Sequence, residues 1–331
     1  MNPTVPFATQ SWPAALWAFS RPHTIWGTLL SVIALGVLAF VLPPGSPLAG
    51  ASPLAAGIDP LRCLALVAAA LLPALAANVY IVGLNQLTDV AIDRINKPQL
   101  PLASGRFSLR QGRAIVAGTA AGALLLAAVQ GPVLFATVVV AMAIGTAYSC
   151  RPLRLKRFPF WAALCIVGVR GAVVNVGFFS HFRSLFSPAA ATDGGGAGLI
   201  LPPEVVALSA FVMIFSLAIA LFKDIPDLRG DREHRIFTLT VRLGPSLVFS
   251  LCRWILTASY GLMILLALSG ALPSIHRGFL ALSQLLLLTV MWIRSLAVNV
   301  WHDEQTKAFY RLIWKLFFLE YLLFPVAALV A

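Results

Sequence analysis

The chain contains 331 residues, of which 60% are hydrophobic and 11% charged, and its formal net charge is +12. Because a soluble domain usually has about 25% charged residues, this composition excludes an ordinary soluble protein and indicates an integral membrane protein. The positive charge predicts anionic partners, namely the headgroups of a lipid bilayer and an anionic substrate. It does not indicate nucleic acid, because no basic amphipathic stretch contains interleaved aromatic residues.

In chain order, apolar runs of roughly 20 residues predict nine membrane-spanning helices. They cover residues 25–43, 63–84, 113–130, 132–149, 159–180, 202–222, 246–268, 278–300 and 312–330. A Gly-Pro pair at 131–132 separates two of these runs and predicts a tight hairpin. We therefore expect one transmembrane domain over residues 1–331, with an N-terminal segment at 1–24 and an all-α bundle of nine transmembrane helices at 25–331.

Lysine and arginine residues are concentrated in the loops on one side of this topology. The loops that share a side with the N-terminus hold the basic residues between positions 94 and 113, 151 and 157, 223 and 242, and 307 and 311. The loops of the opposite side hold Arg62, Arg183 and Arg277. Because basic loops stay on the cytoplasmic side, this asymmetry supports nine spans and places the basic loops in the cytoplasm, or in the stroma of a plastid.

The N-terminus shows no signal-peptide pattern, because only about 24 residues precede the first apolar run and four of them are prolines. A long transit peptide rich in Ser and Arg is also absent. We therefore expect a bacterial protein, or an organellar protein whose transit peptide has been removed.

The first acidic cluster lies at the end of the second predicted span. Asn85, Asp89 and Asp93 are spaced i, i+4 and i+8. On a helix this spacing keeps the three side chains on one face, so they form a polar stripe that emerges from the membrane.

The second acidic cluster follows the sixth predicted span. Asp224, Asp227 and Asp231 are spaced i, i+3 and i+7, which is again one face of a helix. Pro226 and Gly230 are expected to interrupt such a helix. The three carboxylates still converge on a small volume, because they lie within eight residues of the chain.

Together the clusters hold five of the eight aspartates of the chain. Like charges this close repel one another unless a cation lies between them, and oxygen ligands without His or Cys select Mg²⁺ over zinc or copper. We therefore predict Mg²⁺ that bridges both clusters to a diphosphate. The alternative is a solvated loop with helix caps and surface ion pairs. The predicted metal ligands are Asn85, Asp89, Asp93, Asp224, Asp227 and Asp231. The predicted catalytic residues are Asp89, Asp93, Asp224 and Asp227.

Basic residues lie beside both clusters and suit a diphosphate, which Arg binds bidentately and Lys binds as a point charge. The predicted diphosphate-binding residues are Lys97, Arg154, Lys156, Lys223 and Arg229. A positive-inside anchor would explain the basic residues alone, whereas a diphosphate ligand explains the acids and the bases together.

A transporter or channel is the alternative from another class, because it could use the aspartates for cation movement. Transporter acids usually lie near the bilayer midplane. Here the acids lie at the ends of spans, with Lys and Arg beside them, which favours an enzyme. A structural scaffold would not need the acidic stripes, and no obligate protein partner is inferred.

The two clusters match the N-x-x-x-D-x-x-x-D and D-x-x-D-x-x-x-D motifs of the UbiA-type intramembrane prenyltransferases, which the chain resembles over nearly its whole length. Longer stretches resemble the homogentisate prenyltransferase branch of that family. They are residues 19–24, 85–105, 154–157, 170–181 and 313–325. The resemblance implies a nine-helix bundle with a central cavity, dependence on Mg²⁺, and transfer of a prenyl group from a prenyl diphosphate to homogentisate with loss of CO₂.

The carboxylate of such an acceptor needs a cationic partner, and the candidates are Arg21, His23 and Arg170. Arg170 lies within an apolar span, where a buried guanidinium needs an anion or carbonyl partner. A structural ion pair is the alternative for Arg170, and an interfacial or capping role is the alternative for His23.

The missing transit peptide favours a photosynthetic bacterium, and phytyl is therefore the expected donor group. We expect the protein in the thylakoid or plasma membrane of such a bacterium. A plastid membrane is the alternative location. Geranylgeranyl and solanesyl diphosphate remain alternative donors, because sequence periodicity does not report the length of the apolar groove that binds the tail. Among acceptors, 4-hydroxybenzoate, dihydroxynaphthoate and chlorophyllide also stay open.

Overall fold

The computed structural model describes residues 11–43, 52–55, 57–186, 201–233 and 238–331, and it describes residues 229 and 230 without their side chains. Every regular element within these residues is helical. The α-helices are α1 (Trp12–Phe19), α2 (Pro22–Val41), α3 (Pro60–Asn96), α4 (Leu109–Ala128), α5 (Pro132–Ser149), α6 (Pro159–Val167), α7 (Asn175–Phe186), α8 (Pro203–Phe222), α9 (Leu228–Glu233), α10 (Leu239–Leu243), α11 (Pro245–Ser269), α12 (Arg277–Leu296) and α13 (Asp303–Leu329). A 3₁₀ turn, η1 (Leu155–Arg157), and a π-helical segment, η2 (Gly168–Val174), complete the chain.

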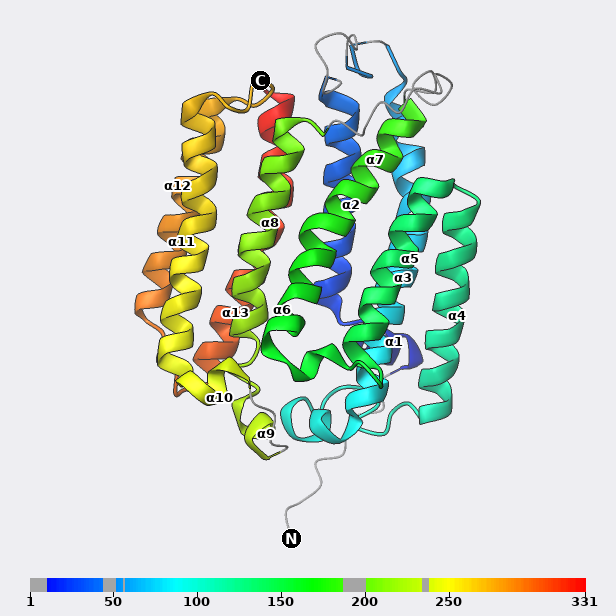
Figure 1. Ribbon diagram of the computed structural model, residues 1–331, viewed down its shortest axis with the longest axis vertical. Coiled ribbons are helices and arrows are strands. Elements are labelled where there is room, and N and C mark those ends of the chain that lie inside the picture. Colours follow the sequence, from blue (N-terminus) through cyan, green and yellow to red (C-terminus); the bar gives the residue numbers. More distant parts are fainter. Residues whose placement is uncertain (1–10, 44–51, 56, 187–200, 234–237) are drawn as a thin grey trace.

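Nine helical segments in the described part of the chain are long and apolar enough to cross a membrane. They are α2, α3, α4, α5, the continuous α6–η2–α7 segment, α8, α11, α12 and α13. The nine predicted spans are therefore confirmed, and so is the tight connection between α4 and α5. Figure 1 shows the segments side by side, with α1, α9 and α10 at one end of the bundle and the C-terminus at the other.

Local sequence determines where many of these helices begin. Six of the membrane-spanning segments start at a proline, whose missing N–H is not needed at the first helical position. Helix α4 begins instead with a capping box, in which Ser108 and Gln111 satisfy each other's backbone N–H groups. Asp59 caps α3 by accepting a hydrogen bond from the N–H of Leu61 at 2.9 Å.

Several helices extend beyond their predicted ends, and α3 and α13 do so by the most residues. The second span was expected to end at residue 84, but α3 continues to Asn96, and the ninth was expected from residue 312, but α13 begins at Asp303. The first span also begins earlier, at Pro22. The added turns of α3 and α13 contain charged residues, so a search for apolar runs truncates both helices.

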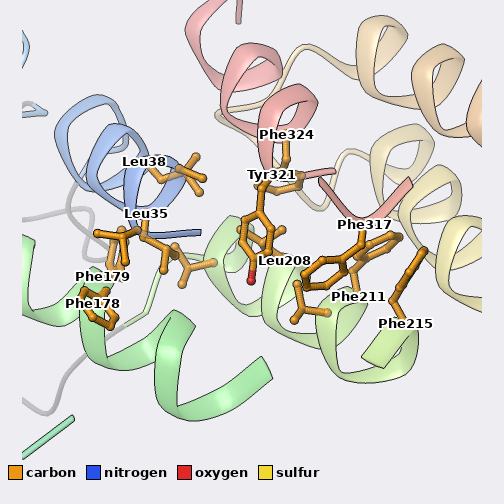
Figure 2. Close-up of a cluster of buried hydrophobic side chains, with 14 of the residues drawn as sticks. Leu35, Leu38, Phe178, Phe179, Leu208, Phe211, Phe215, Phe317, Tyr321 and Phe324 are labelled. Atoms are coloured by element: carbon orange, nitrogen blue, oxygen red, sulfur yellow. The ribbon is translucent and has the colours of Figure 1, made fainter. Parts of the chain in front are cut away.

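The helices associate mainly through close packing. Lipid tails are as apolar as the side chains, so the hydrophobic effect contributes little to helix association in a membrane. Gly36 on α2 permits the closest approach to α3, because a Cβ atom there would lie only 2.3 Å from Cγ2 of Val67. Figure 2 shows the apolar interior, in which Tyr321 of α13 lies between Leu35 of α2 and Phe211 of α8. Helix α2 packs on α3, α7 and α13, while α8 packs on α11 and η2, so the two halves of the bundle enclose a common interior.

Candidate active site

A central cavity of about 290 Å³ is lined by residues of α2, α3, α5, the α6–η2–α7 segment, α8 and α13. At the end near the acidic clusters its wall includes Asn85 and Lys223. About three helical turns further in, the wall includes Ala74 and Thr137. The expected central cavity is therefore present, and it runs from a charged end into an apolar interior.

The first acidic cluster lies where α3 leaves the bundle, and the helix is kinked at Asp89, where φ is −118° and ψ is 15°. The Asp89 carboxylate accepts hydrogen bonds from Nη2 of Arg154 at 3.2 Å and from Nζ of Lys156 at 2.7 Å. Nζ of Lys156 also donates to Oγ1 of Thr88 at 2.7 Å. Burial lowers the pKa of the Lys156 ammonium, and the charge of Asp89 opposes this shift. Two predicted diphosphate-binding residues therefore contact the first cluster directly.

The second acidic cluster lies mainly in the turn between α8 and α9, and not on one continuous helix. Nζ of Lys223 donates to Oδ1 of Asp224 at 2.8 Å, and Lys97, the C-cap residue of α3, forms an ion pair with Asp227. Asp231 is buried in α9. The Lys97 pair brings the two clusters together, although they are more than 100 residues apart in the sequence. Arg229 lies outside the described side chains.

The carboxylates of the second cluster influence one another electrostatically. Burial, together with the charges of Asp224 and Asp227, raises the pKa of Asp231 to about 7. Burial also raises the pKa of Asp224, an effect that Lys223 opposes. Such shifts identify acids that are withdrawn from water and close to each other, where an added cation would stabilise their charged forms.

The donor set fits magnesium. No three His, Cys, Asp or Glu side chains among the described residues are close enough to hold a metal ion without other ligands. However, Oδ2 of Asp93 is buried and has no hydrogen-bond partner, and a buried carboxylate oxygen is costly until a cation or a donor satisfies it. Mg²⁺ takes few protein carboxylates and completes its coordination with phosphate oxygens and water. The clusters therefore suit a metal that arrives with a diphosphate.

Two arginines at this end of the bundle have a left-handed backbone. Arg21 precedes α2 with φ 52°, and Arg154 precedes η1 with φ 39°. Such conformations cost residues other than Gly of order 1–3 kcal/mol and concentrate at functional sites. Nη2 of Arg21 donates to Oδ1 of Asn85 at 3.4 Å, and Arg154 contacts Asp89. Both strained residues therefore direct a guanidinium group to the first cluster.

The three predicted acceptor-binding residues, Arg21, His23 and Arg170, all line the cavity. Arg170 lies in η2, and its guanidinium carbon is 4.6 Å from the centre of the Trp314 ring. The His23 ring meets the edge of the same tryptophan at a centroid distance of 4.8 Å. Nη1 of Arg170 is buried without a partner. The described residues provide no carboxylate in ion-pair contact with Arg170, so the alternative of a structural ion pair has no support.

The sequence profile of the UbiA prenyltransferase family matches residues 45–319 of the chain. The chain belongs to the UbiA prenyltransferase family. It is 46% identical to homogentisate phytyltransferase from Synechocystis over 95% of both chains, and 37% identical to homogentisate phytyltransferase 1 from Arabidopsis thaliana over 94% of this chain and 74% of that protein. Homogentisate geranylgeranyltransferase from Hordeum vulgare is 36% identical over 94% of this chain and 72% of that protein.

Solved structures of UbiA homologues share the fold. The homologue from Archaeoglobus fulgidus bound to GPP and Mg²⁺ superimposes with a TM-score of 0.59 at 18% identity, covering 96% of this chain and all of that chain. The homologue from Aeropyrum pernix gives a TM-score of 0.62 at 19% identity and covers 93% of this chain and 98% of that chain. The UbiA fold predicted from the motifs is therefore confirmed.

The structure adds cavity residues of this UbiA prenyltransferase that were not expected from the sequence. Tyr310, Trp314 and Tyr321 of α13 face the cavity, and the Tyr321 hydroxyl donates to Oδ1 of the buried Asn175 at 2.8 Å. Asn175, Trp314 and Tyr321 lie within the stretches that resemble the homogentisate branch, whereas Tyr310 lies just before the last of them. The available signal was the i, i+4 spacing of Tyr310 and Trp314, with Tyr321 two turns further on the same face.

Proposed function

We propose that this UbiA prenyltransferase transfers a phytyl group from phytyl diphosphate to homogentisate, with loss of CO₂, as one catalytic domain over the whole chain. The observation that carries the proposal is that one cavity joins a cation-rich end beside two acidic clusters to a pocket of Arg170, His23 and aromatic rings. The cation-rich end suits a metal–diphosphate, and the pocket of Arg170, His23 and aromatic rings suits an aromatic acid. The names of the relatives given above support the same substrates.

Mg²⁺ bound by Asn85 and the aspartates of both clusters would neutralise charge on the leaving diphosphate. Lys97, Arg154, Lys156 and Lys223 would contact the diphosphate oxygens once these cations exchange their aspartate partners for it. Arg229 belongs to the same proposal by its sequence position alone.

The acceptor would bind with its ring against Trp314 and its carboxylate against Arg170, since Nη1 of Arg170 is buried and unpaired. Arg21 and His23 would complete this side of the site, where they line the cavity. The rings also exclude water, which would otherwise capture the allylic cation.

The allylic C–O bond breaks and its electron pair leaves with the diphosphate. A ring carbon of the acceptor forms the new C–C bond and releases its proton. The carboxylate leaves as CO₂, and a proton takes its place on the side chain. The residues of the cavity hold both reactants in contact, which replaces a bimolecular encounter with a positioned one.

We also propose that the acidic clusters face the cytoplasm or the stroma. The multi-pass topology puts α9, α10 and the basic loops at one end of the bundle (Figure 1). Basic loops are retained on that side of a membrane. A thylakoid or plasma membrane of a photosynthetic bacterium, or a plastid membrane, is the proposed location.

The test supplies membranes containing the protein with radiolabelled homogentisate and phytyl, geranylgeranyl or solanesyl diphosphate, with Mg²⁺ or with excess chelator. Phytylated product should form only with the metal. Separate Ala substitutions of Asp89, Asp93, Asp224 and Asp227 should each abolish transfer. Asp59→Asn is the matched control, because Asp59 caps α3 at the opposite end of the helix and Asn is an equally good cap. Activity that persists in all four Ala variants would refute the metal site.

A further inference from the structure

Three polar side chains interrupt the apolar wall in the middle of the cavity. Thr24 and Thr28 of α2 and Asn78 of α3 all line the cavity there, and we call them the Thr–Asn cluster. Asn78 lies seven residues before Asn85 on the same helix, which corresponds to about 10 Å along the axis. The Thr–Asn cluster therefore lies deeper in the bundle than the acidic clusters, away from the proposed metal site.

The hydrogen bonds of Asn78 fix the orientation of its amide group. Oδ1 of Asn78 accepts from Oγ1 of Thr24 at 3.0 Å. Nδ2 of Asn78 donates to the backbone carbonyl of Thr24 at 3.3 Å and to Oγ1 of Thr28 at 2.9 Å. A carbonyl oxygen only accepts hydrogen bonds, so the amide atom that faces it is the nitrogen. Because that nitrogen only donates, Oγ1 of Thr28 is the acceptor of its bond with Asn78.

This arrangement leaves the hydroxyl proton of Thr28 available. The described wall of the cavity contains four serines and threonines, and the other three donate to backbone carbonyls. Thr24 donates to the carbonyl of Arg21 at 2.9 Å, Ser31 to that of Thr28 at 3.0 Å, and Thr137 to that of Val133 at 2.7 Å. Thr28 donates to none of the described residues, and its side chain faces the cavity, so its proton can serve a ligand.

Thr28 also lies beside the pocket that we propose for the aromatic acceptor. Gly27, the preceding residue of α2, lines the cavity, and a Cβ atom there would lie 3.7 Å from Cζ3 of Trp314. Consecutive helical residues are only about 1.5 Å apart along the axis, so Thr28 is level with the Trp314 ring. The guanidinium carbon of Arg170 lies 4.6 Å from the centre of that ring. The pocket thus offers a guanidinium for a carboxylate and, from another helix, one neutral hydroxyl donor.

We propose that the Thr28 hydroxyl donates a hydrogen bond to a phenolic oxygen of the acceptor, and that the enzyme thereby selects hydroxylated aromatic acids. The inference rests on the proposed function, because it assumes that the acceptor ring binds beside Trp314. Asn78 is the positioning residue. A threonine hydroxyl on a helix otherwise turns to the carbonyl four residues earlier, which for Thr28 is the Thr24 carbonyl that Asn78 occupies.

The test measures how tightly three aromatic acids bind as competitive inhibitors against homogentisate, at saturating prenyl diphosphate. Phenylacetate has no hydroxyl group, whereas 2-hydroxyphenylacetate and 3-hydroxyphenylacetate each keep one of the two hydroxyl groups of homogentisate. A hydrogen bond between neutral groups changes affinity by roughly 2- to 12-fold. At least one hydroxylated acid should therefore have an inhibition constant lower than that of phenylacetate by this factor.

Thr28→Val removes the hydroxyl at nearly constant size and should abolish the preference for hydroxylated acids. It should also raise the KM for homogentisate by roughly 2- to 12-fold with little change in kcat. Thr28→Ser keeps the donor and should retain the preference. Thr119→Val on α4 is the matched control, because Thr119 donates to the carbonyl of Ile115 at 2.8 Å and lies outside the cavity wall. Its preference should equal that of the wild type.

Asn78→Ala tests the positioning role while Thr28 stays in place. It should weaken the preference as Thr28→Val does, and Thr28→Val should have little further effect when it is added to Asn78→Ala, because both act through one hydrogen bond. Equal inhibition constants of the three acids in the wild type would overturn the proposal, and so would an unchanged preference in Thr28→Val. If Thr28→Val does not fold, Asn78→Ala decides: a lost preference supports the proposal and an unchanged one refutes it.

The identity of the substrate is tested separately from the recognition of its hydroxyl group. If the wild type prenylates no homogentisate, the proposed function fails. The shift in the melting temperature of the purified protein with each acid then replaces the inhibition constants. A larger shift with a hydroxylated acid than with phenylacetate, lost in Thr28→Val, would still support the hydrogen bond, and absent or equal shifts would refute it.

Discussion

Arg170 offers the sharpest test of the acceptor site, because its guanidinium group lies in the cavity wall with Nη1 buried and unpaired. Arg170→Met keeps an unbranched side chain over Trp314 and removes the charge and all five donors. Arg170→Lys keeps the charge but removes the planar pair of donors. If Arg170 binds the acceptor carboxylate, the two variants should lose affinity for homogentisate in a graded way.

The expected loss follows from the contact that is removed. A hydrogen bond to a charged group contributes about 1.5–3 kcal/mol, and about 1.4 kcal/mol corresponds to a factor of ten. Arg170→Met should therefore lower kcat/KM for homogentisate by roughly 10- to 150-fold, with most of the change in the KM for the acceptor. The KM for the prenyl diphosphate should change little, because Arg170 does not contact the acidic clusters.

Steady-state rates with homogentisate varied at saturating donor give both constants, and a melting curve of each variant reports its stability. Arg183→Met is the matched control from the same membrane segment. The Arg183 guanidinium donates to the carbonyls of Ala39 and Leu42 at the end of α2, at 3.2 and 2.9 Å, and lies outside the cavity wall. An unchanged acceptor KM in Arg170→Met, with a loss of thermal stability like that of Arg183→Met, would show that Arg170 is structural.

Two further predictions concern the proposed diphosphate-binding residues and the packing of the helices. Lys156→Met should raise the KM for the prenyl diphosphate at least tenfold, because the ammonium group lies beside Asp89 and the side chain is only 11% exposed. Lys315→Met, at an exposed position of α13, is the control and should leave this KM unchanged. An unchanged donor KM would remove Lys156 from the diphosphate site. Gly36→Ala should destabilise the bundle by about 1–3 kcal/mol through its clash with Val67, whereas Gly118→Ala, with open space around it, should be neutral or stabilising; equal melting temperatures for the two variants would contradict the packing argument.

The sequence predicts the bundle well because the thickness of the bilayer fixes the length of the apolar run in every span. Each apolar run had to be about 20 residues long, and all nine recur as helices. The amphipathic turns at the end of α3 and the start of α13 were missed for the same reason, since they lie outside the apolar band. The π-helical segment around Arg170 was missed because the change from i→i−4 to i→i−5 hydrogen bonds does not alter the hydropathy of the sequence.

The predicted site residues whose side chains the structure describes come together, but their partners were not predictable. Lys97 and Asp227 pair across more than 100 residues, and Arg154 reaches Asp89 from another loop. Such pairs depend on how the halves of the bundle pack, which single-sequence periodicity does not report. The left-handed backbone at Arg21 and Arg154 was equally hidden, because the usual sequence signal for such a conformation is glycine.

The ion pairs of the site also have a thermodynamic consequence. Asp89 pairs with Arg154 and Lys156, Asp224 with Lys223, and Asp227 with Lys97. A diphosphate that arrives alone would take cations from partly buried acids and leave those acids unpaired, and a metal ion that arrives alone would leave the cations unpaired. When both bind, the aspartates would pair with the metal ion and the Lys and Arg side chains with the diphosphate. At the proposed site we therefore expect the metal and the diphosphate to bind cooperatively, each raising the affinity for the other by the same factor. Such a site would discriminate against free phosphate and free divalent cations without any contact devoted to rejecting them.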